Sequence, residues 1–165
     1  MLWPSIALLI FVTLQRLAEL VYARHNTKAL LARGAREYAA AHYPLMVAMH
    51  ATWLIGLWVF AIGRPIEPVW LSLFMILQAL RLWVLATLGD RWTTRIIILP
   101  GAPLVTKGPY RLLSHPNYAV VVGEIATLPL AFGMPIYAAI FSVLNAVILI
   151  IRIRAENACL KQAFT

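Results

Sequence analysis

Charged side chains are scarce in this sequence, and their scarcity excludes an ordinary soluble fold. Only 12% of the 165 residues are charged, whereas 62% are hydrophobic. A soluble domain is about a quarter charged and nearer half apolar, because its surface has to be polar. With a mean hydropathy of +0.82, the chain is typical of a membrane protein.

Cysteine and glycine are also few. The single Cys159 excludes an intramolecular disulfide and a metal site built from cysteine alone. The four histidines show no metal-ligand spacing, so we expect no metal site. The eight glycines form neither a Walker loop nor a glycine-rich dinucleotide turn. This pattern excludes a nucleotide-binding domain of the doubly wound kind.

Acidic residues are outnumbered by basic ones. The chain has six acidic and 14 basic residues, for a net charge of +8. A nucleic-acid-binding protein carries its basic residues on a soluble face, whereas here they fall between apolar runs. We therefore expect no nucleic-acid partner and attribute the positive charge to membrane topology.

Several apolar runs approach the ~20 residues of a membrane-spanning helix. We predict an all-α, polytopic membrane protein with about five transmembrane helices, folded as one domain over residues 1–165. The expected spans are residues 2–22, 44–62, 69–88, 118–132 and 136–154. The first run resembles a signal peptide in length but has neither a basic start nor a small-residue cleavage site, so we expect it to remain a helix.

The sequence also predicts the local structure of two connecting segments and of the fourth span. Residues 24–43 are polar and predict an interfacial loop or a short amphipathic helix. Residues 96–99 and 103–106 flank a Pro-Gly pair that is typical of a type II turn, and they predict a short hairpin. The fourth span reaches only about 22 Å, against a hydrocarbon core of ~30 Å. We expect it to stop short, or the polar segment before it to dip toward the membrane.

The basic residues are distributed unequally over the two sides of the predicted bundle. The side opposite to most of them has only Arg64. The basic residues that follow the first, third and fifth spans are Arg24, Lys28, Arg33, Arg36, Arg91, Arg95, Lys107, Arg111, Arg152, Arg154 and Lys161. Because cytoplasmic loops are rich in lysine and arginine, we predict that the chain starts outside. The 89–117 segment and the C-terminal tail then share the cytoplasmic side.

The first polar cluster on that side precedes the fourth span. Pro116 restricts His115 away from helical geometry, so His115 is expected at the cap of the helix that follows. Lys107 and Arg111 flank this helix start, where a carboxylate or phosphate is favoured. An ordinary capped basic turn at the membrane interface explains these residues equally well.

The second polar cluster lies at the end of the fifth span. Arg152 and Glu156 are four residues apart and therefore share one face of a helix, with Asn157 beside them. Because the two clusters are expected on the same side of the membrane, their side chains can meet. The alternative is a helix that simply ends in charged residues.

Ionisable residues inside the spans are hypotheses for functional sites, since burying them in a membrane is costly. Arg81 and Glu124 have no local partner, and we expect them to pair across helices or to line a polar cavity. Arg16 and Glu19 are three residues apart and predict a local ion pair. His50 is interpreted as an interior histidine with satisfied hydrogen bonds.

Five segments taken together resemble the isoprenylcysteine carboxyl methyltransferase family. They cover roughly residues 78–160 and occur in the family's order and at its separations. They are Arg81-Leu82-Trp83, Leu88-Gly89 with Trp92-Thr93-Thr94-Arg95-Ile96, Gly108-Pro109-Tyr110-Arg111, Ser114-His115-Pro116-Asn117-Tyr118, and Arg152-Ile153 with Glu156 and Leu160. The resemblance implies an integral membrane enzyme that uses S-adenosylmethionine, with a cofactor and catalytic part at about residues 89–165.

The resemblance also implies roles for single residues. Arg152 would orient the nucleophilic oxygen of the acceptor, with Glu156 and Asn157 beside it as further catalytic residues. The residues that would bind the cofactor are Lys107, Gly108, Tyr110, Arg111, His115, Pro116, Tyr118 and Glu156.

Two positions depart from the family's common pattern and bear on the acceptor. Ser114 stands where an arginine is common, and Asn157 stands where a second glutamate is common. Asn157 removes a carboxylate from the region expected to bind substrate. The sequence is more similar to a bacterial branch associated with type III polyketide synthases. An isoprenylcysteine-type carboxylate and a long-chain alkylpyrone or phenolic lipid therefore both stay open as acceptors.

Three other functions are alternatives to methyl transfer. Arg81 and Glu124 inside spans also fit a small membrane transporter or channel subunit, and a haem- or quinone-binding anchor would need a histidine to pair with His50. A reductase of the same membrane superfamily is the third alternative.

We expect a lipophilic or prenylated substrate, contact with membrane lipids, and a place in a bacterial inner membrane with the active site facing the cytoplasm. The sequence does not determine the oligomeric state.

Overall fold

The computed structural model describes residues 2–164, with side chains for residues 2–159, and this part of the chain forms five α-helices. Their bounds are α1 Trp3–Ala32, α2 Tyr43–Phe60, α3 Pro68–Leu88, α4 Pro116–Ala131 and α5 Pro135–Phe164. Each begins with a proline in its first two positions. Proline suits this place because the first turn leaves its N–H groups unbonded in any case.

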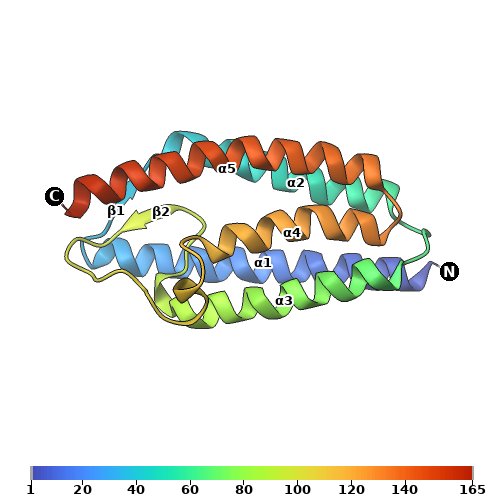
Figure 1. Cartoon of the computed structure of the whole chain (residues 1–165), viewed down its shortest axis with the longest axis horizontal. Coiled ribbons are helices and arrows are strands. Elements are labelled where there is room, and N and C mark those ends of the chain that lie inside the picture. Colours follow the sequence, from blue (N-terminus) through green and yellow to red (C-terminus); the bar gives the residue numbers. More distant parts are fainter. Residues whose placement is uncertain (1, 165) are drawn as a thin grey trace.

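The helices run alternately up and down along one long axis, with the two termini at opposite ends (Figure 1). Within the described residues, four helices are long and apolar enough to cross a membrane, namely α1, α2, α3 and α5. Their outer faces expose large apolar side chains such as Trp3, Val69 and Ile136. Apolar surface of this kind is stable against lipid and not against water, which confirms the all-α membrane fold.

Helix α4 is short and central. Its 16 residues span about 24 Å, less than the ~30 Å hydrocarbon core, as expected for a span that stops short. It packs against both α3 and α5, and Glu124 and Leu128 are completely buried. Gly123 allows the close approach to α3, because a β-carbon there would lie 2.7 Å from a methyl group of Leu77.

The prediction of a loop or short amphipathic helix after residue 22 is wrong, because α1 continues to Ala32. Tertiary contacts hold this extension in place. Ala23 and Leu30 are buried on its inner face, and the amide of Asn26 donates to the carbonyl oxygens of Gly89 at 3.1 Å and Trp92 at 2.9 Å. Arg24, His25 and Lys28 are exposed on the outer face of the same helix.

The predicted hairpin between residues 96–99 and 103–106 is also wrong. The strand β2, Ile96–Ile98, pairs antiparallel with β1, Arg36–Tyr38, from the distant α1–α2 connection. The turn itself is as predicted, since Gly101 has a φ of 75° and the amide of Ala102 donates to the carbonyl of Leu99 at 3.2 Å. A turn determines where the chain reverses, but the strand pairs with whichever edge the helices bring beside it.

Both β-strands and the C-terminal end of α5 lie at the same end of the bundle (Figure 1). The segments after α1 and α3 meet there, and Arg64 lies in the α2–α3 connection at the opposite end. The grouping of basic segments that the sequence predicts is therefore present in the fold. We call this end of the molecule the basic end.

Candidate functional site

The centre of the site is a hydrogen-bonded group formed by Tyr118, Arg152 and Glu156. The hydroxyl of Tyr118, in the first turn of α4, donates to Glu156 Oε2 at 2.5 Å and accepts a hydrogen bond from Arg152 Nε at 2.9 Å. The ring of His115 stacks on that of Tyr118, with centroids 5.2 Å apart. The structure thus brings together four residues that the sequence placed in two separate clusters.

Arg152 is held from several sides at once. Its Nη2 donates to the backbone carbonyl of Thr94 at 2.6 Å, and its Nη1 lies 2.8 Å from the sulfur of Met46 on α2. The side chain is only 6% exposed. A guanidinium has five N–H donors, and together with the bond to Tyr118 these contacts use three. Two donors therefore remain for an oxygen atom of a ligand.

A cavity of about 490 Å³ opens on one side of this group, and we call it the outer cavity. Its walls include β2, residues 99 and 102–106, and the side chains of Tyr110, His115, Tyr118, Glu156 and Asn157. The volume lies in the range of cofactor sites, roughly 300–1,000 Å³. A carboxylate beside aromatic faces can hold a ligand that carries a positive charge.

The segment before α4 builds one wall of the outer cavity. It forms a short 3-10 helix, Gly108–Arg111, that rests on the end of α3. Gly108 has a φ of 59°, and a β-carbon there would lie 2.6 Å from the Thr87 hydroxyl. Burial, followed by the negative charge of Glu156, raises the pKa of Tyr110 to about 12. Tyr110 is therefore a neutral hydrogen-bonding group at physiological pH.

Four of the predicted cofactor-binding residues do not line the outer cavity. Lys107 and Arg111 are exposed and, like Gly108 and Pro116, are absent from its walls. His115 precedes α4 as predicted, but its side chain makes no capping hydrogen bond. The two basic residues expected to flank an anion at this helix start therefore do not line the outer cavity.

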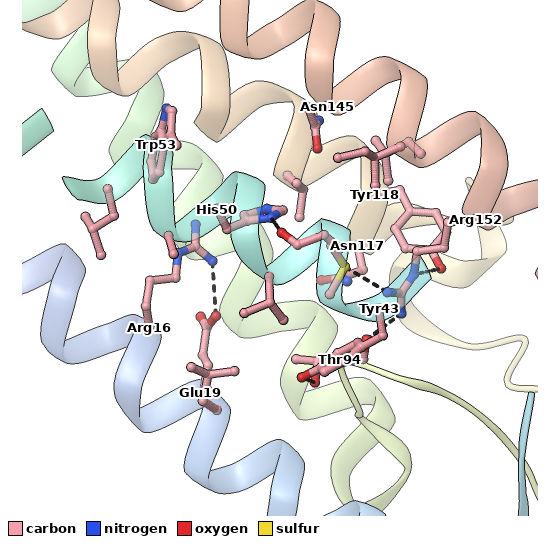
Figure 2. Close-up of a pocket in the computed structure, with 18 of the residues that line it drawn as sticks. Arg16, Glu19, Tyr43, His50, Trp53, Thr94, Asn117, Tyr118, Asn145 and Arg152 are labelled. Atoms are coloured by element: carbon pink, nitrogen blue, oxygen red, sulfur yellow. Dashed lines mark hydrogen bonds and ion pairs between the residues drawn. The ribbon is translucent and has the colours of Figure 1, made fainter. Parts of the chain in front are cut away.

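A second cavity of about 310 Å³ lies inside the bundle, between α1, α2, α4 and α5, and we call it the inner cavity (Figure 2). Most of its lining is apolar, and Leu17 and Val47 line it although they are 54% and 40% exposed. Helices α1 and α2 make few direct contacts with each other. The inner cavity therefore opens sideways between α1 and α2, where the bilayer would be.

The two cavities share one wall. Tyr118 and Arg152 line both, together with Trp92, Thr93 and Asn117. A polar ligand in the outer cavity and an apolar ligand in the inner cavity would meet at the hydroxyl and guanidinium of this wall. The arrangement suits the transfer of a small group from one ligand to the other.

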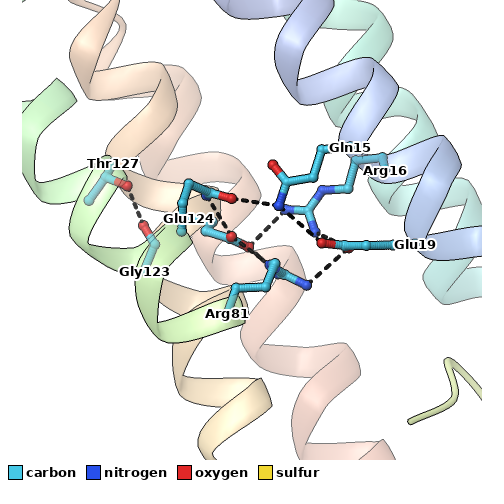
Figure 3. Close-up of polar contacts among 8 residues, drawn as sticks. Gln15, Arg16, Glu19, Arg81, Gly123, Glu124 and Thr127 are labelled. Atoms are coloured by element: carbon cyan, nitrogen blue, oxygen red, sulfur yellow. Dashed lines mark hydrogen bonds and ion pairs between the residues drawn. The ribbon is translucent and has the colours of Figure 1, made fainter. Parts of the chain in front are cut away.

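Deeper in the bundle, the side chains of Arg16, Glu19, Arg81 and Glu124 form what we call the charge network (Figure 3). Glu124 accepts hydrogen bonds from Arg81 and Arg16, the latter at 2.8 Å, and Arg81 also reaches Glu19 at 3.2 Å. The predicted pairing of Arg81 and Glu124 across helices is confirmed. Arg16 does bind Glu19 at 3.1 Å, but its second bond to Glu124 means that the pair is not merely local.

Several polar groups of the inner cavity have no site role predicted from the sequence, although Trp92 and Asn117 belong to its motifs. Trp53, Trp92, Asn117 and Asn145 each have one buried polar atom without a hydrogen-bond partner among the described residues, and all four line this cavity. Asn145 could have been identified from the sequence, since it stands seven residues before Arg152 and so shares its helix face. Thr94 could not, because it contributes a backbone carbonyl, which every residue has.

Comparison with known proteins gives a consistent result. Residues 70–162 match the model of the isoprenylcysteine carboxyl methyltransferase (ICMT) family. The uncharacterized protein YpbQ of Bacillus subtilis is 39% identical over 167 residues, covering 98% of both chains. An uncharacterized protein of Haemophilus influenzae is 25% identical over 155 residues, covering 86% of this chain and 85% of its own. No solved structure matches the chain significantly.

Proposed function

This chain belongs to the isoprenylcysteine carboxyl methyltransferase family, and from that premise we propose that it transfers a methyl group from S-adenosylmethionine to an oxygen of a lipophilic acceptor. Membership implies a membrane methyltransferase. The observation that carries the more specific proposal is the shared wall, where a polar outer cavity and a mostly apolar inner cavity meet at Tyr118 and Arg152.

The residues of the outer cavity fit S-adenosylmethionine by their chemistry. Its sulfonium and ammonium groups suit the Glu156 carboxylate, and its adenine ring suits the aromatic side chains of Tyr110, His115 and Tyr118. Asn157 supplies an amide at the same edge. When bound, S-adenosylmethionine supplies an electrophilic methyl group on a positively charged sulfur.

The role proposed for Arg152 is to aim the oxygen of the acceptor. Arg152 is part of the wall common to both cavities and has two unused N–H donors, while its other contacts hold the guanidinium in one position. Positioning of this kind supplies much of the rate in a displacement reaction. An acceptor that is already an anion, such as a carboxylate or an acidic hydroxypyrone, then needs no general base.

A neutral hydroxyl acceptor has to lose a proton. Glu156 is the better candidate for the base, since it already accepts the hydrogen bond of Tyr118, and His115 is the other polar group stacked on the same ring. The proton would pass from the acceptor to Tyr118 as Tyr118 passes its own to Glu156. The site thus serves either acceptor class, an isoprenylcysteine-type carboxylate or an alkylpyrone or phenolic lipid.

The proposed setting is a bacterial inner membrane with the basic end in the cytoplasm. The excess of arginine and lysine at this end supports that orientation, and both relatives come from bacteria. The sideways opening between α1 and α2 would admit the tail of the acceptor directly from the bilayer.

Incubation of the purified protein in nanodiscs with methyl-labelled S-adenosylmethionine tests the proposal. The acceptors are prenylcysteines, alkylpyrones, alkylresorcinols and phospholipid amines, each in its own reaction. We expect label in an oxygen-linked methyl group of at least one lipophilic acceptor. Label in an amine alone would refute O-methylation, and absence of both cofactor binding and transfer would refute the methyltransferase itself.

A further inference from the structure

The inner cavity contains polar groups that an apolar tail cannot satisfy. Asn145, in the middle of α5, is 1% exposed, and its Oδ1 has no hydrogen-bond partner among the described residues. A buried polar atom without a partner costs about 1–3 kcal/mol, and no water is available from the surrounding lipid. Reversing the amide would leave its nitrogen in the same position, so a partner is needed in either orientation.

His50 on α2 presents a second free acceptor. Its Nδ1 lies 2.9 Å from the carbonyl oxygen of Met46, and because a carbonyl only accepts, Nδ1 must carry the hydrogen. In the neutral ring Nε2 is then an acceptor, and His50 lines the inner cavity. Asn145 points from α5 into the same space in front of α2 (Figure 2).

The depth of these two groups follows from the contact between Met46 and Arg152. Asn145 is seven residues before Arg152, which places it about 10 Å deeper along α5. His50 is four residues after Met46, about 6 Å deeper along the antiparallel α2. Both acceptors therefore lie one to two helical turns below the guanidinium that would hold the reacting oxygen.

We propose that His50 and Asn145 form a specificity subsite that binds a second hydroxyl group of the acceptor, beyond the oxygen that is methylated. A hydroxyl can donate to Nε2 or Oδ1 and can also accept from the amide nitrogen in the reversed orientation, whereas a bare hydrocarbon tail does neither and a carboxylate cannot donate. The inference rests on the proposed function for the identity of the reacting oxygen. It assigns the choice among acceptors to side chains outside the family's sequence motifs.

A matched pair of lipids tests the subsite by binding alone, without methyl donor. Pentadecylresorcinol carries two ring hydroxyls, and pentadecylphenol carries one on the same ring and tail. We expect the resorcinol to bind the wild-type protein in nanodiscs about tenfold more tightly, the equivalent of about 1.4 kcal/mol. A ratio of about twofold or less overturns the proposal, because the two equivalent orientations of resorcinol account for that much.

Variants separate a ligand-binding role from a structural one. Asn145→Leu and His50→Phe should bring the ratio of the two affinities close to one, while Ser142→Ala, a half-buried site on α5 outside both cavities, should leave it unchanged. Asn145→Leu should also keep or raise the melting temperature of the lipid-free protein, because it removes an unpartnered polar atom. A lower melting temperature with an unchanged ratio would mean that Asn145 is structural.

Failure of the subsite and failure of the proposed function give different results. If prenylcysteine carboxylates are methylated while neither phenolic lipid binds, the subsite is refuted and the methyltransferase stands. If the resorcinol binds selectively but no acceptor receives a methyl group, the subsite stands and the proposed activity fails.

Discussion

The charge network in the middle of the bundle and the Tyr118–Arg152–Glu156 group at its basic end are built from the same kinds of side chain. In the charge network two arginines face two glutamates, and Glu124 is completely buried and accepts bonds from both arginines and from Gln78. In the second group Arg152 keeps two unused donors and stands between two cavities. Buried charge beside a cavity therefore does not by itself identify a reactive site, since Arg16, Glu19 and Arg81 also line the inner cavity. The difference is that Arg152 lines both cavities.

The largest effect should come from unbalancing the charge network. Glu124→Leu removes one of the two carboxylates that Arg16 and Arg81 share, and breaking a buried pair in this way costs about 3–5 kcal/mol of unfolding free energy. Thermal unfolding in detergent should show a strongly lowered midpoint.

Replacing the opposing groups together provides the control for Glu124→Leu. The double variant Glu124→Leu with Arg81→Met should lose less stability than the two single losses added, since their energies are coupled. Additive losses would show that the network is not one unit.

Arg152→Ala should separate activity from folding. We expect a fall of about 100-fold in kcat/KM, because the acceptor oxygen loses its alignment, while the melting temperature changes far less than for Glu124→Leu. Arg154→Ala is the matched control, since Arg154 is exposed on the same helix. Equal losses in both variants would contradict the assignment of Arg152 to the site.

Removing the ion pair between Arg95 and Glu37 should have a smaller effect on stability and activity. Their side chains meet at 2.7 Å across the β1–β2 sheet beside the outer cavity, and both are partly exposed. Such pairs contribute about 0–1 kcal/mol. A double-mutant cycle should give a coupling energy in this range, with a few-fold rise in KM for S-adenosylmethionine. An unchanged KM would show that the sheet does not shape the cofactor site.

The smallest expected effect concerns Tyr110 at alkaline pH. Its pKa is raised from 10.0 to about 12 in the folded protein, so the folded state retains a proton that the unfolded chain loses first. The stabilisation is complete below pH 10 and is lost as the pH rises toward 12. The melting temperature of Tyr110→Phe should fall less than that of the wild type over this interval. If the melting temperatures of the variant and the wild type fall equally over this interval, the raised pKa of Tyr110 is contradicted.

Much of the site could be predicted from the sequence because its motifs are local. Helix spacing placed Arg152 and Glu156 on one face of α5, and Pro116 located the start of α4. The expectation for Lys107 and Arg111 rested on charge near a helix start, and charge alone does not determine where a long side chain points. Both are exposed, and neither lines the outer cavity.

The sequence by itself determined the apolar helices and the grouping of basic residues at one end, because partition into a bilayer depends on local composition. Only the tertiary structure decided which distant residues contact one another. Ile96–Ile98 pairs with Arg36–Tyr38, Arg16 reaches Glu124, and the carbonyl of Thr94 holds Arg152. Each of these contacts joins segments far apart in the chain, and its geometry exists only after the helices have packed. The cavities on either side of Arg152 arise in the same way, from spaces that packed helices leave unfilled.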